Sequence, residues 1–219
     1  MGEQDRRGVY ELLTARLAPW AGEGDSIHFD RIVHAPVDDE LVGLVAEALV
    51  DEDAVTRRAG LFVLAGLQDE TAARLDPFRP LAPKVRDLLL DGDAGVRCDA
   101  LMAFAYFDPD DLHVAVREFL GDPDGRNRLQ AVRILDAEGR SDNLPTLLTL
   151  GFDPYHESAE DAREWLVVRE AARGAVERTA HIHFPTSVTE EEVEGVRCVY
   201  HAWDDVWKWA AREGIRGRG

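Results

Sequence analysis

The sequence predicts an all-α protein, a right-handed α-solenoid of about four helical hairpins with a capping segment at each end. Three observations predict this fold. A short motif, D-x-D-x-x-x-R, occurs three times along the chain. Apolar residues near each copy are spaced as on one side of a helix. No segment shows the sustained alternation with β-branched residues that is typical of strands, so the sequence predicts no β-sheet.

The motif copies divide the middle of the chain into units of about 31 residues, which is the period expected of a helical repeat. Longer intervals contain insertions at DETAARLDPFRP and GFDPYHESAE. A weaker fourth copy centres on Val168-Arg169, where Ala172 matches Ala100, but it lacks aspartates at the right spacing. The three full copies are Asp51-Glu52-Asp53 with Arg57, Asp91-Gly92-Asp93 with Arg97, and Asp122-Pro123-Asp124 with Arg128.

Each unit has the periodicity of a helix pair joined by a tight acidic turn. In the second copy Val96, Ala100, Phe104 and Phe107 recur at helical spacing and form one stripe. The expected helix pairs are 38–50 with 54–67, 80–90 with 94–107, 109–120 with 125–137, and 142–150 with 161–180.

The motif residues favour a structural role over a metal or phosphate site. A turn aspartate can accept hydrogen bonds from the free N–H groups at the start of the next helix. An arginine one turn later can pair with a turn carboxylate of its own repeat or of a neighbouring one. A binding site needs residues that converge, whereas repeats hold equivalent residues about one helix pair apart.

The pattern D-x-D-x-x-V-R-x-x-A, as in DGDAGVRCDA, resembles the turn and second helix of HEAT repeats, particularly the short bacterial HEAT-like form. The resemblance covers roughly residues 38–180. It implies a solenoid whose second helices line a concave face, and it implies little about function. Aligning the copies gives candidate partner-binding residues on that face: Arg58, Phe62, Asp99, Met102, Tyr106, Gln130, Arg133 and Arg178.

The two ends of the chain are expected to cap this array. Residues 1–37 contain a short helix, about Val9 to Ala18, which Pro19 is expected to end. Residues 181–213 are expected to be a C-terminal aromatic capping helix, with Thr189 and Glu192 as a capping box ahead of its apolar stripe. Its apolar stripe comprises Val193, Val196, Tyr200, Trp203, Trp207 and Ala210. Trp209 lies off this stripe, so the helix is either a cap or a partner-binding element. Residues 214–219 are expected to be a flexible tail.

Composition and charge exclude several classes of function. With 43 acidic against 25 basic residues, the net charge is -18, which argues against nucleic-acid binding. No apolar run is long enough for a membrane span, and the first residues do not resemble a secretory signal. Two cysteines are too few for a disulfide framework, which favours a reducing cytoplasm.

One metal constellation deserves testing. His181, His183, Cys198 and His201 have side chains that suit zinc, and the spacing H-x-H followed by C-x-x-H could chelate one ion. Other enzyme templates are absent. The chain has no phosphate-binding glycine loop, nucleophile elbow or HExxH motif, and no cofactor is expected. HEAT-repeat iron hydroxylases use several His-Glu pairs, but only His156-Glu157 occurs here.

The sequence therefore predicts a scaffold or adaptor that binds a partner protein through its concave face, an acidic ridge, or both. Acidic residues of the inter-helix turns would align into the ridge and steer a basic partner. The alternative is an enzyme, either metal-dependent through the His/Cys set or a HEAT-like lyase. The partner, the pathway and the oligomeric state are not specified. The ridge comprises Asp51, Glu52, Asp53, Asp91, Asp93, Asp122, Asp124, Asp153, Glu157, Glu160 and Asp161, with Arg126 the only base nearby.

Overall fold

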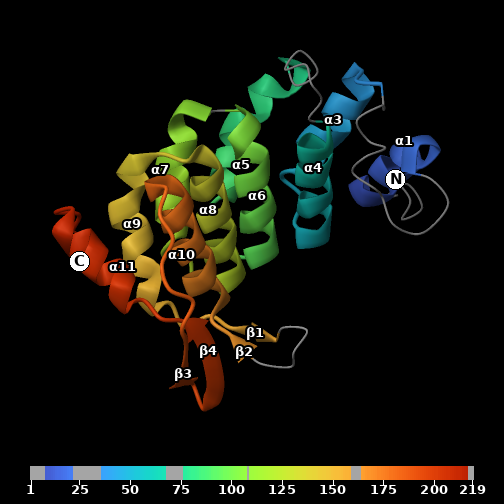
Figure 1. Cartoon of the computed structure of the whole chain (residues 1–219). Helices are drawn as coiled ribbons and strands as arrows, with labels where there is room; N and C mark the ends of the chain where they lie inside the picture. Colours follow the sequence, from blue (N-terminus) through green and yellow to red (C-terminus); the bar gives the residue numbers. More distant parts are fainter. Residues whose placement is uncertain (1–7, 22–35, 68–75, 108, 159–163, 217–219) are drawn as a thin grey trace. The chain divides into compact units, whose positions relative to one another are not determined.

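The protein is largely α-helical, as the sequence predicts. Its computed structural model describes residues 8–21, 36–67, 76–107, 109–158 and 164–216 (Figure 1). The chain divides into two compact units, Met1–Leu112 and His113–Gly219.

The first unit begins with helix α1 (Val9–Ala21), which packs against α3 (Asp39–Ala48) and α4 (Ala54–Gly66). Leu13 and Leu17 of the predicted helix are buried. The expectation that Pro19 ends the helix is wrong, since α1 continues to Ala21. A proline removes one backbone donor, but contacts with α3 and α4 hold the helix in place.

Two helical hairpins complete the first unit. The first is α3 with α4. The second joins a 3₁₀ turn, η2 (Asp76–Leu81), and α5 (Ala82–Leu88) to α6 (Ala94–Phe107). The second helices of the two hairpins, α4 and α6, pack against each other, and their inner side chains, including Leu61, Leu64 and Val96, are fully buried. These bounds agree closely with the predicted pairs. Part of the predicted insertion, residues 68–75, lies outside the described residues.

Helix α7 (Pro109–Phe119) begins in the first unit and continues into the second, where α8 (Gly125–Glu138) follows. Gly139 ends α8 in a left-handed conformation (φ 61°), which glycine adopts without strain. The next hairpin consists of η3 (Ser141–Asn143), α9 (Leu144–Thr149), η4 (Leu150–Phe152) and α10 (Val167–Ala180). Helix α10 packs against both α8 and α9. It begins at Val167, whereas the sequence predicted a helix from 161.

The acidic turns have the structural role that their spacing predicts. Asp53 accepts a hydrogen bond from the Thr56 N–H (3.0 Å), and Asp93 accepts one from the Val96 N–H (2.9 Å). Bonds from the Thr56 hydroxyl and N–H lower the pKa of Asp53. In each turn the aspartate two positions earlier accepts from the backbone N–H of the capping aspartate. The motif therefore caps the second helix of its hairpin.

The motif arginines bind their own turn, and Arg57 and Arg128 also bind the next turn along the chain. Arg57 donates to the carbonyl oxygens of Asp51 and Glu52 and pairs with Asp91. Arg128 donates in the same way to the carbonyls of residues 122 and 123, and makes a two-pronged pair with Asp153 at 2.6 and 3.0 Å. These pairs join consecutive helical hairpins within each unit.

The fold is mostly helical as predicted, but the second unit also contains a small four-stranded sheet, whereas the sequence predicted no strands. The strands are β1 (Glu157–Ser158), β2 (Glu164–Trp165), β3 (Val188–Val193) and β4 (Val196–His201), in the order β1-β2-β4-β3. β3 pairs with β4 in antiparallel register, and β2 pairs with β4 in parallel register. Leu166, Val193 and Cys198 form the buried centre of this region.

The predicted single helix over 181–213 is therefore wrong, and only α11 (Asp204–Arg212) remains helical. Glu194 and Gly195 have φ values of 52° and 82°, and two consecutive positive values are typical of a two-residue hairpin turn. Val193 and Val196 are cross-strand partners beside this turn, so the hairpin itself produces a three-residue spacing that imitates a helix. Thr189, predicted to cap a helix, pairs with Tyr200.

The chain turns back at the end of α11. After α11, Gly214 adopts φ 69° and the Ile215 N–H donates to the Ala210 carbonyl. Of the predicted tail, residues 217–219 lie outside the described residues. Among the described helices, none is both long and apolar enough to cross a membrane.

Candidate functional site

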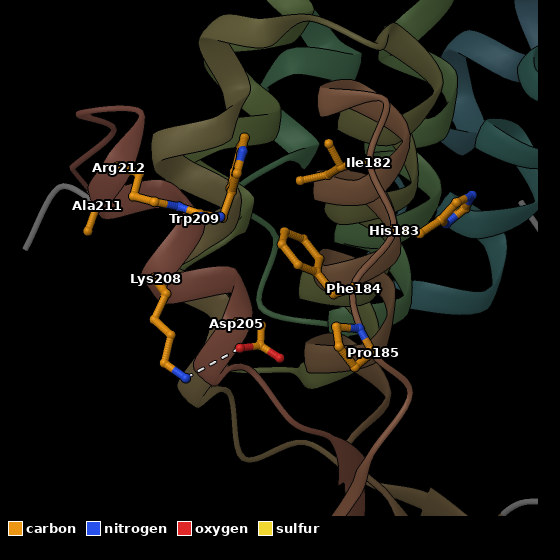
Figure 2. A pocket seen from close by; sticks show the side chains of 9 residues that line it. All are labelled: Ile182, His183, Phe184, Pro185, Asp205, Lys208, Trp209, Ala211 and Arg212. Carbon is orange, nitrogen blue, oxygen red and sulfur yellow. Dashed lines mark hydrogen bonds and ion pairs between the residues drawn. The ribbon is translucent and has the colours of Figure 1, made fainter.

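The second unit has an open groove between helix α11 and the extended segment that follows α10. Its volume is about 850 Å³. Figure 2 shows Phe184 and Trp209 on opposite sides of this hollow. The groove is lined by Ile182, His183, Phe184, Pro185, Asp205, Lys208, Trp209, Ala211 and Arg212.

One wall of the groove is the segment 182–185, which two side chains of α10 hold in place. His181 ends α10 in a left-handed conformation (φ 54°), so the chain reverses and runs back along the helix. The Phe184 N–H then donates to the Glu177 carboxylate (2.9 Å). Arg173, which is buried, donates to the Pro185 carbonyl (2.9 Å) and pairs with Glu177 (3.1 Å). The wall is therefore fixed by charge-assisted bonds.

The other wall is α11, which a cluster of aromatic rings attaches to the unit. Trp203 and Val206 are buried, and the rings of Trp203 and Trp207 lie 5.1 Å apart. The ring of Phe152 stacks on that of Trp207 at 5.4 Å, although 73% of Phe152 is exposed. Trp209 points to the other side of the helix, where its ring meets that of Phe184 edge to face at 5.9 Å.

Charged groups along the α11 wall are predominantly cationic. Lys208 donates to Asp205 at 3.3 Å, and both side chains are largely exposed. Arg212 lies one helical turn further on, and no hydrogen bond or ion pair with another described residue holds its side chain. Figure 2 shows the His183 ring turned away from α11, and its side chain is 97% exposed.

The lining of the groove is largely apolar. It combines two aromatic rings, a proline and aliphatic groups with two cations and the Asp205 carboxylate at the rim. An apolar floor with few polar groups at its edge is typical of sites that bind a partner's side chain.

The predicted metal ligands are not brought together. His181 is exposed at the end of α10, while Cys198 is buried and its thiol contacts the Val196 carbonyl. His201 Nδ1 lies 2.6 Å from the Glu170 carboxylate, which also accepts the His201 N–H. Cys198 and His201 are three positions apart on a strand and so point to opposite faces, whereas a helix would have placed them on one. Within the described parts of the chain, no group of three or more potential ligands could hold a metal ion.

Apart from Trp209 of α11, the predicted partner-binding residues lie on the second helices of the hairpins, in both units. Two of the arginines are paired with aspartates of the neighbouring second helix. Arg58 of α4 meets Asp99 of α6 at 2.7 Å, and Arg178 of α10 meets Asp136 of α8 at 2.6 Å. Arg133 is exposed, whereas Phe62, Met102, Gln130 and Trp209 are half-buried. The side chain of Tyr106 lies outside the described part. A binding role for these residues stays a prediction.

The expected acidic ridge is more neutralised than the turn sequences indicate. Arg126 is not the only base in these turns, because Arg57, Arg97 and Arg128 donate to turn carbonyls from the following helix. Asp91 and Asp153 are paired with arginines. Glu160 and Asp161 lie outside the described residues. Steering of a basic partner by the remaining carboxylates stays a prediction.

Sequence reasoning identified Trp209 but not the rest of the groove. Ile182, Phe184 and Pro185 stand beside the two histidines that suggested a metal site, and Lys208 and Arg212 lie in the predicted cap. A Phe-Pro pair directly after a helix was the available signal. Comparison with known proteins supplies no family: no family model matches the chain, and no similar protein was found among curated ones.

Proposed function

We propose that the protein is a protein-binding scaffold or adaptor, and that a partner segment occupies the groove between 182–185 and α11. The proposal includes the arrangement of the helical hairpins. The helical hairpins with their capped acidic turns would be HEAT-like repeats stacked as a right-handed solenoid. The packing of α4 against α6, and of α8 against α10, supports this arrangement, since stacked second helices are what such an array requires.

The single observation that carries the binding proposal is the half-buried Trp209 beside Phe184 in an open, largely apolar hollow. Tryptophan is enriched among residues that dominate binding energy, particularly where a neighbouring pocket excludes water. The Phe184 wall is held by Arg173 and Glu177, so it is preorganised and little ordering cost falls on binding.

A random-peptide selection on the immobilised full chain tests this function. A selected peptide carrying a fluorescent label is then measured by anisotropy against the parent and two variants. Trp209→Ala should weaken binding about tenfold or more, the effect expected for a central aromatic anchor. Leu90→Ala removes an apolar side chain that is 86% exposed in the first unit, and should leave the affinity unchanged.

Circular dichroism of the variants confirms that the fold is retained. If selected peptides bind the parent and Trp209→Ala equally well, the groove is not the binding surface and the proposal fails in this form.

A further inference from the structure

We propose that the segment recognised by the groove is acidic, with an apolar side chain next to aspartate or glutamate residues. This inference rests on the proposed function and names the chemistry of the partner. The apolar side chain would lie against the contacting rings of Phe184 and Trp209, and the carboxylates would meet the cations of α11.

The apolar floor of the groove favours an apolar side chain in the partner segment. Phe184 and Trp209 meet edge to face rather than stacked, and the hollow between their two segments is open to solvent (Figure 2). Ile182, Pro185 and Ala211 add apolar surface at the sides. Burying one aromatic or branched aliphatic side chain here would remove apolar area from water on both partners.

The two cations of α11, Lys208 and Arg212, favour aspartate or glutamate residues in the partner segment. Lys208 and Arg212 are four positions apart, which places them on the same side of the helix along the groove. Lys208 is only loosely engaged by Asp205, because that pair is largely exposed and its bond is 3.3 Å long. Arg212 makes no hydrogen bond or ion pair with a described carboxylate, so its guanidinium can form a two-pronged bond to an incoming one.

This rim differs from its surroundings. The whole chain has a net charge of -18, and several other arginines of the second unit are already paired, as Arg128 is with Asp153 and Arg178 with Asp136. Lys208 and Arg212 against the single carboxylate of Asp205 therefore make this rim locally cationic in an acidic protein. Charge complementarity at a short distance selects carboxylates there, although the chain as a whole would repel them at long range.

The test uses two degenerate peptide pools with a shared central Phe-Leu. Flanking positions are drawn from Asp, Glu, Ser and Gly in the acidic pool, and from Lys, Arg, Ser and Gly in the basic pool. Because an acidic chain can retain basic peptides anywhere on its surface, retention by Trp209→Ala is subtracted from every value. The remaining signal reports the groove alone.

The parent should retain the acidic pool at least tenfold more than the basic pool after this subtraction. The double variant Lys208→Glu/Arg212→Glu should reverse the preference, and Arg212→Lys should keep it. Arg133→Glu is the matched control, because Arg133 is also exposed but lies on α8, away from the groove lining. It should behave as the parent does.

The outcomes separate the two proposals. The acidic preference is overturned, while the binding function stands, by either of two results. One is groove-dependent retention that favours the basic pool, and the other is a preference that is unchanged in the double variant Lys208→Glu/Arg212→Glu. If neither pool is retained in a way that depends on Trp209, and random selection also gives no such peptide, both proposals fall.

Discussion

Arg169 donates to the backbone oxygen of Asp153 across 2.8 Å, although the two residues are 16 positions apart in the chain. In the other turns the equivalent arginine follows the first aspartate by six positions, as Arg57 follows Asp51 and Arg128 follows Asp122. Asp153 also accepts the Tyr155 N–H, as the first aspartate of each turn accepts the N–H two residues later. The fourth motif copy therefore exists, interrupted by β1 and β2.

Beyond its own turn, Arg169 reaches the β-hairpin. Its guanidinium pairs with Glu191 of β3 at 2.7 Å and lies 4.8 Å from the centre of the Tyr200 ring. Glu191 thus takes the position that Asp153 has for Arg128. The β3–β4 hairpin thus continues the series of ion pairs that begins with Arg128 and Asp153 in this unit.

The first prediction concerns this arginine. Arg169→Leu should destabilise the protein by about 2 kcal/mol, because it leaves the buried Asp153 carbonyl and the partly exposed Glu191 carboxylate without a charged donor. Arg197→Gln breaks the pair with Glu190, which is exposed on the same hairpin, and should cost between about 0 and 1 kcal/mol. Urea unfolding of the two variants measures both. Equal losses would show that Arg169 has no special role.

A second prediction concerns the helix caps. Asp93→Ala removes the acceptor for the Val96 N–H and should lower the free energy of unfolding by about 1 kcal/mol. Asp93→Asn keeps a side-chain oxygen and should lose less. Neither variant should weaken binding of a peptide to the groove. A variant as stable as the parent that has lost binding would instead assign the motif a functional role.

The helices could be predicted because local signals and tertiary contacts agree in them. The D-x-D-x-x-x-R turns supply both the cap and the pair to the next hairpin, so one motif fixes helix starts and their stacking. The full fourth copy could not be recognised in the sequence, because the strands inserted after Asp153 separate this residue from Arg169. No sequence spacing reveals that the two residues meet.

The C-terminal region could not be predicted for a different reason. Val193 and Val196 imitate a helical spacing, and only the positive φ values of Glu194 and Gly195 distinguish a hairpin from a helix. The groove is formed by this same region, whose structure the sequence pattern mispredicts. Phe184 and Trp209 come together because His181 reverses the chain and the hairpin returns it to α11, and both are tertiary consequences that the separate segments do not encode.

A third prediction concerns a glycine that the fold requires. A Cβ on Gly125 would lie 2.0 Å from Cγ of Tyr155, so neither side chain could stay in place. Gly125→Ala should destabilise by about 2 kcal/mol through overpacking. Gly43→Ala, in helix α3 with no atom within 4 Å of the added Cβ, should instead stabilise by about 0.5 kcal/mol or more. Thermal unfolding gives both signs, and a stabilising Gly125→Ala would contradict the packing of Tyr155 against α8.

The last prediction concerns acid. The hydrogen bond from Arg169 lowers the pKa of Glu191 below its ordinary value of 4.5, with a smaller contribution from the Tyr200 hydroxyl, while burial opposes the shift. A carboxyl whose pKa is lower in the folded state stabilises that state above the unfolded pKa, and this stability is lost as the pH falls through the folded value. Glu191→Gln should therefore be less stable than the parent at pH 7, and the difference should shrink as the pH is lowered below about 4.5.

Glu192→Gln, one residue along the same strand and exposed, is the control and should differ little from the parent at either pH. The measurement is urea unfolding of the three proteins across a pH series. A gap between Glu191→Gln and the parent that stays constant into acid would show that the charge of Glu191 does not hold the hairpin to α10.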